Sequence, residues 1–197
     1  MRITAGTLKN REVFSFKDKE GSLRPTSSKT RQAVFNLLSH SKFLHEIDFL
    51  TEENPSLIRD RVIADIYCGT GIVGFEAYSR GAKTLIFVDK NGQTLDMVKK
   101  SAQKLGAYEN CLFVRSSAVQ LPSPRIKADV IFIDPPYNKD LIVPTLQSLA
   151  ANMWARDGGV VICEHSIKER FTPFAPYTLL DQREYNNSFI TILKVTY

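Results

Sequence analysis

From Arg61 onward, short apolar runs alternate with stretches in which apolar residues recur every three or four positions. Buried strands are predicted at the runs RVIADIY, TLIFVD, CLFVRS, DVIFID and GVVICEH. Helical spacing lies between them in GIVGFEAYSR, in GQTLDMVKKSAQKLGA and over about residues 141–153. Strands separated by crossover helices predict a mostly parallel sheet that is covered on both faces.

The two ends of the chain carry different patterns. Residues 177–197 predict a terminal hairpin with its turn at Asn186-Asn187, so the far edge of the sheet should be antiparallel. Residues 2–16 alternate around Lys9-Asn10 and predict a short hairpin outside the main sheet. A helix follows in RPTSSKTRQAVFNLLSH, where Pro25 precedes several hydroxyl residues suited to cap it.

The chain length of 197 residues fits one domain with a small extension. We predict a basic N-terminal hairpin and helix over residues 1–42 that do not form an independent domain. Residues 43–60 have mixed signals and predict an irregular or partly helical connection. The alternating strands and helices of residues 61–197 form the main domain.

Composition limits the class of protein. Hydrophobic residues make up 43% and charged residues 24%, which is typical of soluble globular proteins. The longest apolar runs are far too short to span a membrane, and the N-terminus does not read as a signal peptide. The three cysteines, Cys68, Cys111 and Cys163, show no paired spacing, so we expect reduced thiols and no zinc site. Together with the short apolar runs, this predicts a cytoplasmic protein without membrane contact.

Positive charge is concentrated near the N-terminus. Residues 1–42 hold nine Lys and Arg against three Asp and Glu, whereas the whole chain has a net charge of only +5. A one-sided positive segment favours a polyanionic partner such as a nucleic acid. The alternative is a solvated basic face that has no partner.

A glycine-rich loop follows the first strand of the main domain. Gly69, Gly71 and Gly74 have the spacing G-x-G-x-x-G between a strand and a helix, where a ligand can approach the backbone. The next strand ends in Asp89, whose carboxylate can accept hydrogen bonds from both ribose hydroxyls. Sheets that bind NAD and sheets that bind S-adenosylmethionine share both features, so these two features leave the cofactor open.

Asp65, four residues before Gly69, favours one of these cofactors. A carboxylate beside the loop would repel the pyrophosphate of a dinucleotide, whereas it suits the sulfonium and ammonium of S-adenosylmethionine. The alternative is that Asp65 only bonds the backbone of its own loop. Ser117 and Ala118, after the third strand, are candidates for the adenine edge, although ordinary loop residues would look the same.

A second motif, Asp134-Pro135-Pro136-Tyr137, ends the fourth strand at the same edge of the sheet. The carboxylate of Asp134 and the carbonyl of Pro135 are acceptors, and Tyr137 offers a face on which a flat base can stack. Together they suit an exocyclic amine on a planar ring, held so that its lone pair meets a methyl donor. Taken alone, the motif could equally be a turn that ends a strand.

The segments DIYCGTGIVGFEAYSRGA, FVDKN and FIDPPY together resemble amino-group methyltransferases that use S-adenosylmethionine. LRPTSSKTRQAVFNLL, VVICEHS and REYNNSFITILKV are similar to the bacterial RsmD family, which methylates guanine N2 in 16S ribosomal RNA. The resemblance covers nearly the whole chain. It implies a Rossmann-like class I methyltransferase fold, S-adenosylmethionine as cofactor, and 16S rRNA or a small-subunit assembly particle as the partner of a monomeric enzyme.

The same resemblance assigns residues to roles. Cofactor contacts fall on Asp65, Cys68, Gly69, Gly71, Asp89, Lys90, Ser117 and Ala118. The target amine falls on Asp134, Pro135, Pro136 and Tyr137. The N-terminal signature around Arg24-Pro25-Thr26 is expected to bind substrate RNA and to close the active site. Arg24, Lys29 and Arg31 would bind the RNA phosphates.

The chain departs from the family pattern at three places: the long connection 43–60, Asn186 where a glycine is expected, and Ser117 where Asp or Asn is common. Three other functions stay open at this point. An adenine-N6 methyltransferase that acts on DNA or RNA would use Asp134-Pro-Pro-Tyr137 equally well. An NAD-dependent oxidoreductase would need an acid or base, and His40, His45 and His165 read as surface or structural residues. The third is an RNA-binding protein without catalysis.

Overall fold

The computed structural model describes residues 1–14, 28–185 and 187–197. Four residues singled out in the sequence analysis lie outside these ranges: Arg24, Pro25, Thr26 and Asn186. The elements in chain order are α1 (Ser28–His40), the 3₁₀ helix η1 (Lys42–Glu46), β1 (Val62–Ile66), α2 (Ile72–Ser79), β2 (Thr84–Asp89), α3 (Gly92–Leu105), the 3₁₀ helix η2 (Tyr108–Asn110), β3 (Cys111–Arg115), β4 (Ala128–Ile133), α4 (Ile142–Ala151), β5 (Ala155–Ser166), β6 (Tyr177–Tyr185) and β7 (Ser188–Val195).

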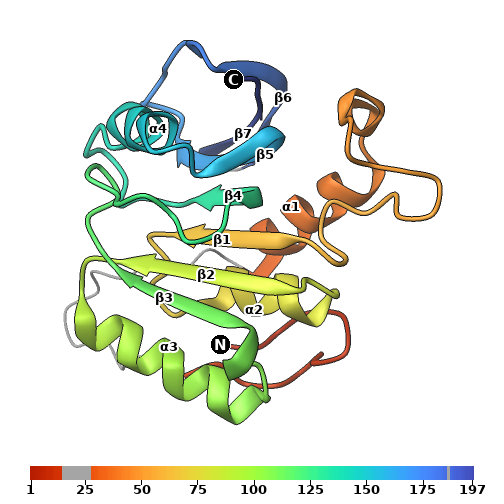
Figure 1. Ribbon diagram of the computed structural model, residues 1–197, viewed down its shortest axis with the longest axis vertical. Coiled ribbons are helices and arrows are strands. Elements are labelled where there is room, and N and C mark those ends of the chain that lie inside the picture. The colour runs from red at the N-terminus through yellow and green to blue at the C-terminus, as the bar shows by residue number, and fades with distance from the viewer. Residues whose placement is uncertain (15–27, 186) are drawn as a thin grey trace.

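One seven-stranded sheet runs through the molecule in the order β3-β2-β1-β4-β5-β7-β6 (Figure 1). The strands β1 to β5 pair in parallel. β7 pairs antiparallel with β5, and β6 pairs antiparallel with β7 at the edge. These pairings confirm the prediction of a mostly parallel sheet with an antiparallel terminal hairpin. The strand order also reverses after β1, as in a doubly wound fold.

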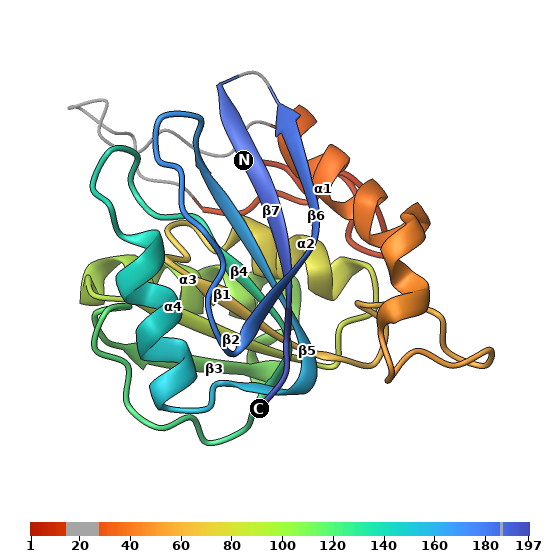
Figure 2. The same cartoon turned by 90° about the horizontal axis from the view of Figure 1, so that it is seen from above.

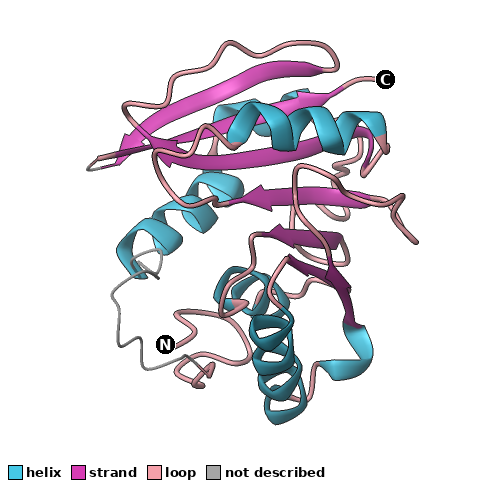
Figure 3. Ribbon diagram, turned by 90° about the vertical axis from the view of Figure 1, so that its left-hand side faces the viewer, coloured by secondary structure: helices cyan, strands magenta, loops and turns pink. Residues whose placement is uncertain are grey.

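Side chains alternate between two hydrophobic cores, one on each face of the sheet. In β4, Val130 and Phe132 face the core under α1, α2 and α3, whereas Ile131 and Ile133 face the core under α4. Figure 2 shows α1 and α4 on opposite sides of the sheet, and Figure 3 shows the same layers from the side. This alternation, with both faces covered, explains the nearly continuous apolar runs of the central strands.

The N-terminal segment lies against α2 and α3 outside the sheet. Its two arms meet in an antiparallel bridge between Arg2 and Glu12. Ile3 and Val13 are fully buried in the core that α2 and α3 share. The predicted hairpin is present as far as residue 14, and it completes the main core.

The connection between α1 and β1 contains η1 and then continues without regular structure, and Figure 2 shows it projecting from the body of the molecule. It is tied back at Phe49, whose ring lies 4.7 Å from the guanidinium carbon of Arg61 and 4.9 Å from that of Arg156. Lys194 also pairs with Asp48 at 2.7 Å. No helix in the described part of the chain is long and apolar enough to cross a membrane.

Candidate active site

The carboxyl ends of the parallel strands meet at one edge of the sheet, where ligands of such sheets bind. There β1 leads into the glycine loop and β2 ends in Asp89, while β4 leads into Asp134. β2 and β3 end together, because Asp89 pairs with Arg115. The structure therefore brings together the segments that the sequence marked as candidates.

The glycines of the loop differ in how closely they are packed. Gly71 is the residue before α2 and has a left-handed backbone with φ 74°, and a Cβ there would lie about 3 Å from Val98 and Phe75. A Cβ on Gly74 would lie 2.4 Å from the ring of Phe87. These two glycines let α2 pack against β2 and α3. Gly69 differs, because a Cβ on it would meet no atom closer than the Tyr67 carbonyl oxygen at 3.9 Å.

Asp89 is tied to this open part of the loop. Its Oδ2 accepts a hydrogen bond from the Gly69 N–H at 3.3 Å, and its Oδ1 accepts one from the Asn91 N–H at 2.8 Å. The backbone N–H of Ser116 donates to the carbonyl of Asp89 at 3.2 Å, so the loop that carries Ser117 and Ala118 begins beside it. Ser117 is half-buried and Ala118 is buried. The glycine loop and the Asp89 carboxylate are thus in contact, and the segment that carries Ser117 and Ala118 begins at the backbone of Asp89.

Asp65 is buried below the loop, with 4% of its surface exposed. Its Oδ2 accepts a hydrogen bond at 3.0 Å from the backbone N–H of Gly74, which lies in the first turn of α2. The pKa of Asp65 is raised to about 8, mainly by burial; the hydrogen bond from Gly74 opposes this rise, and the nearby carboxylates of Asp134 and Asp89 add to it. The backbone role that the sequence left as the alternative is therefore present.

On the other side of the site, Tyr137 is fixed by a residue from the next strand. Its hydroxyl donates a hydrogen bond of 2.7 Å to Oε1 of Glu164 in β5. Asp134 is half-buried, Pro135 is buried and Pro136 is exposed. The loop that follows is held by Glu169, whose Oε1 accepts from the backbone N–H groups of Lys139 and Asp140 at 2.8 and 3.0 Å.

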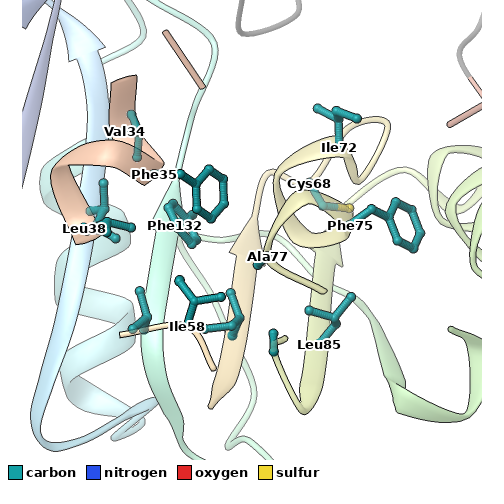
Figure 4. Close-up of a cluster of buried hydrophobic side chains, with 14 of the residues drawn as sticks. Val34, Phe35, Leu38, Ile58, Cys68, Ile72, Phe75, Ala77, Leu85 and Phe132 are labelled. Atoms are coloured by element: carbon teal, nitrogen blue, oxygen red, sulfur yellow. The ribbon is translucent and has the colours of Figure 1, made fainter. Parts of the chain in front are cut away.

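A pocket, here called the α1 pocket, opens between α1 and the ends of β4, β5 and β7. Its cavity volume is about 30 Å³, and the empty space between its walls, open solvent included, is about 380 Å³. Figure 4 shows Val34 and Phe35 of α1 beside Phe132 of β4, and the centres of the two phenyl rings are 5.6 Å apart. Its lining consists of Arg31, Val34, Phe35, Asp65, Val73, Phe132, Ile133, Asp134, Ile162, Glu164 and Ile190. An apolar wall with three carboxyl groups at one end suits a flat ring whose edge carries hydrogen-bond donors.

Arg31 does not lie on the surface, where an RNA-contacting cation was expected. Its side chain is 3% exposed, and its Nε pairs with Glu76 at 3.4 Å. Its Nη2 also donates to the carbonyl of Arg2 at 3.0 Å. Burial lowers the pKa of Arg31, and the Glu76 carboxylate opposes that effect. Arg31 is therefore enclosed, and it helps to hold α1 in position, while its predicted contact with an RNA phosphate stays a prediction.

Glu76 is the centre of this buried cluster, and the sequence analysis did not single it out. Its side chain has no exposed surface. It pairs with Arg80 at 3.0 Å and accepts hydrogen bonds from the N–H groups of Thr4 and Ala5 and from the Thr4 hydroxyl. One carboxylate therefore joins α2 to α1 and to the N-terminal segment. The only sequence signal was an acidic residue inside the otherwise apolar run GIVGFEAY.

The other candidate residues lie in different surroundings. Lys29 on α1 and Lys90 after β2 are exposed, as surface contacts require. Cys68 is buried in the core beside α2. His165 is buried in β5 and contacts the Thr191 hydroxyl at 2.8 Å, so it is structural.

The comparisons with known proteins agree with this geometry. The family model described as "Conserved hypothetical protein 95" matches residues 1–194. The chain is 30% identical over 188 residues to "Ribosomal RNA small subunit methyltransferase D" of Buchnera aphidicola subsp. Acyrthosiphon pisum, covering 93% of this chain and 87% of that protein. It is 28% identical over 188 residues to the protein of the same name from Haemophilus influenzae, covering 93% and 88%.

Among solved structures, the fold is similar to "Putative methyltransferase yhhF from Escherichia coli", with a TM-score of 0.77 and 22% identity over 100% of this chain and 98% of that one. Sheet order, glycine loop and site together define a Rossmann-like class I methyltransferase. The chain belongs to the family of Conserved hypothetical protein 95, which is the RsmD family. The resemblance drawn from the sequence is confirmed.

Proposed function

We propose that the protein transfers a methyl group from S-adenosylmethionine to the N2 amine of a guanine in 16S ribosomal RNA. The observation that carries the proposal is the proximity of two sites at one sheet edge. One is the open space at Gly69 and Asp89, and the other is the socket at Asp134 and Tyr137. The relatives named as small-subunit rRNA methyltransferases support the choice of substrate.

The residues at the glycine loop fit the cofactor. The space above Gly69 leaves the loop backbone accessible, and Asp89 stands beside it with a carboxylate suited to ribose hydroxyls. Ser117 and Ala118 follow the neighbouring strand, where the adenine would lie. S-adenosylmethionine, when bound, supplies an electrophilic methyl group on its sulfonium.

The chain's own residues prepare the amine. In this proposal Tyr137 stacks on the guanine, and the carboxylate of Asp134 and the carbonyl of Pro135 accept the two amine hydrogens. Holding both hydrogens turns the nitrogen lone pair toward the methyl group, and Asp134 or water takes the proton that the methylated nitrogen loses. Such a guanine is unpaired or flipped out of its stack, since a paired N2 amine is out of reach.

The exposed cations lie where the N-terminal segment and α1 face solvent. Lys9, Arg11 and Lys29 are exposed. They support binding of RNA phosphates, which makes affinity fall as salt rises. Arg31 serves this surface indirectly, because its ion pair with Glu76 holds α1 in position.

The test is methyl transfer from labelled S-adenosylmethionine to small-subunit rRNA that lacks its modifications, supplied as naked RNA and as assembled particles. Digestion to nucleosides should give labelled N2-methylguanosine. Labelled N6-methyladenosine would instead show an adenine methyltransferase with the same socket. Absence of transfer to either form, by a protein that binds the cofactor, would refute the proposal.

A further inference from the structure

Glu164 was not identified from the sequence as a site residue, yet it stands beside the proposed target amine. β4 and β5 run in parallel with Ile133 opposite Cys163, so the next residues along, Asp134 and Glu164, follow side by side on neighbouring strands. Both line the α1 pocket, on the same face of the sheet as Phe132 and Ile162. Neighbouring strands are about 4.8 Å apart, which sets the spacing of the two residues.

The carboxyl group of Glu164 is oriented by hydrogen bonds from two neighbouring side chains. The Tyr137 hydroxyl donates to its Oε1 at 2.7 Å, and Ser188 is a second hydrogen-bonding neighbour. Within residues 1–14, 28–185 and 187–197 no lysine or arginine forms an ion pair with it, and Arg31, which lines the same pocket, pairs with Glu76. Burial raises the pKa of Glu164, so a further hydrogen-bond donor would stabilise its charged form. An ionised carboxylate has about four acceptor positions, and two neighbours do not fill them.

The two purines that carry an exocyclic amine differ at the atom next to it. Guanine has an N1–H donor beside its N2 amine, whereas adenine has an N1 lone pair beside its N6 amine. A carboxylate one strand away from Asp134 can accept the N1–H of guanine while Asp134 accepts from the amine. The same carboxylate faces the N1 lone pair of adenine and repels it, and a buried polar group left unpaired discriminates strongly.

We propose that Glu164 selects guanine, by accepting a hydrogen bond from N1–H while Asp134 holds the neighbouring amine. The inference rests on the proposed function and adds to it the residue that separates N2-guanine from N6-adenine methylation. A purely structural alternative is that Glu164 only orients the ring of Tyr137. The two roles predict different responses to a base that keeps the amine but lacks N1–H.

2-Aminopurine is such a base. The experiment first maps the guanine that the wild-type protein methylates, and then uses RNA in which a ligated synthetic segment carries 2-aminopurine at that position. The ratio of kcat/KM for guanine RNA to kcat/KM for 2-aminopurine RNA is measured for the wild type, Glu164→Gln and Tyr137→Phe. Glutamine keeps the volume of the side chain and an acceptor for Tyr137, and phenylalanine removes only the hydroxyl.

We expect Glu164→Gln to lower the guanine preference about tenfold or more, since a hydrogen bond to a charged group is lost while the glutamine amide can donate to N1 of 2-aminopurine. Tyr137→Phe should lower both rates by the same factor and leave the ratio unchanged. Glu164→Asp keeps the charge and should keep the preference at a lower rate. Glu109→Gln, the same change at an exposed site in η2, should match the wild type.

A ratio that does not change in Glu164→Gln would overturn the inference. So would an equal change of the ratio in Glu164→Gln and Tyr137→Phe, because Glu164 would then act only through the tyrosine. A mapping step that finds no N2-methylguanosine refutes the proposed function itself, and the inference with it. Thermal unfolding of each variant, with and without S-adenosylmethionine, shows that the altered ratio comes from a folded protein.

Discussion

The two halves of the active-site edge are built in different ways. The half at β1, β2 and β3 is formed mainly by backbone: a loop with left-handed residues, an open glycine, and one carboxylate that accepts from the loop. The half at β4 and β5 is formed by side chains from separate segments, with Tyr137 bonded to Glu164 and α1 closing the pocket. A backbone site tolerates many side chains, whereas a side-chain site depends on each partner.

Glu76 joins the two halves. It lies in α2, directly after the glycine loop, and it binds Arg31 of α1, which covers the pocket on the other side. The same carboxylate accepts from the backbone of Thr4 and Ala5. Substitutions in one half of the active-site edge should therefore affect mainly that half, whereas a substitution of Glu76 should affect both.

The largest effect is expected at Asp134 on the side-chain half. Asp134→Ala removes the proposed acceptor for the amine, and we expect kcat to fall about 10²–10⁴-fold. The affinity for S-adenosylmethionine, measured by calorimetry, should stay the same. Asp134→Asn keeps an acceptor oxygen and should lose less. Methylation at the wild-type rate by the alanine variant would exclude Asp134 from the reaction.

The second prediction concerns the buried ion pairs of Glu76 that join the two halves. Glu76→Ala leaves Arg31 and Arg80 without their buried partner, and breaking such a pair costs about 3–5 kcal/mol of unfolding free energy. Urea denaturation measures the loss. Glu12→Ala, which breaks the exposed pair with Arg2, serves as the control and should change stability little. If Glu76→Ala were as mild as Glu12→Ala, the cluster would not be what joins the two halves.

The third effect concerns pH and Asp65. In the unfolded chain this carboxyl loses its proton near pH 4, whereas in the folded protein it keeps the proton up to about pH 8. Its contribution to stability is therefore fully present below about pH 4 and is lost as the pH rises toward 8. Asp65→Asn keeps an acceptor for Gly74, so we expect it to be more stable than the wild type at pH 8, by on the order of a few kcal/mol.

Thermal unfolding at pH 5 and pH 8 checks this expectation. Equal pH dependence in the wild type and in Asp65→Asn would contradict it. The affinity for S-adenosylmethionine separates the two roles of Asp65, since a loss in the asparagine variant requires that the charge itself acts on the cofactor. An unchanged affinity leaves Asp65 as a support for the backbone alone.

The smallest effects compare two glycines of the backbone half. Gly74→Ala places a Cβ 2.4 Å from the Phe87 ring and should cost about 1–3 kcal/mol of stability. Gly69→Ala meets open space, and its left-handed backbone costs only about 1 kcal/mol. We expect Gly69→Ala to lose more cofactor affinity than stability, and Gly74→Ala the reverse. Calorimetry and urea denaturation on the same samples measure both. The opposite pattern would show that the open glycine is not part of the ligand site.

The backbone half was predicted well from the sequence because its determinants are local. A strand, three glycines and a helix lie within residues 62–79, and Asp89 ends the next strand. The side-chain half was predicted only in part. Asp134-Pro-Pro-Tyr137 is a local motif, whereas Glu164 lies 27 residues beyond Tyr137 in the segment VVICEHS, and no local pattern there links it to Tyr137.

The burial of Arg31, like the position of Glu164, was not predicted from the sequence. In the sequence it is one of several cations in a basic segment, and Lys29, two residues away, is exposed as expected. The helical spacing of Arg31 from the buried Val34 and Leu38 is compatible with the buried face of α1, but its ion-pair partner Glu76 is 45 residues away and no local pattern identifies it. A charged side chain is costly to bury without an oppositely charged partner, and only the tertiary structure brings that partner close.

The sequence by itself determined the order of strands and helices, the loop at Gly69 and the position of Asp134 at the end of β4. These follow from apolar periodicity and from backbone preferences, which act over a few residues. The tertiary structure alone decided that Glu76 would hold Arg31 and that Glu164 would stand beside Asp134. Those contacts depend on which strands become neighbours and on which helix covers them, and no short-range preference encodes that choice.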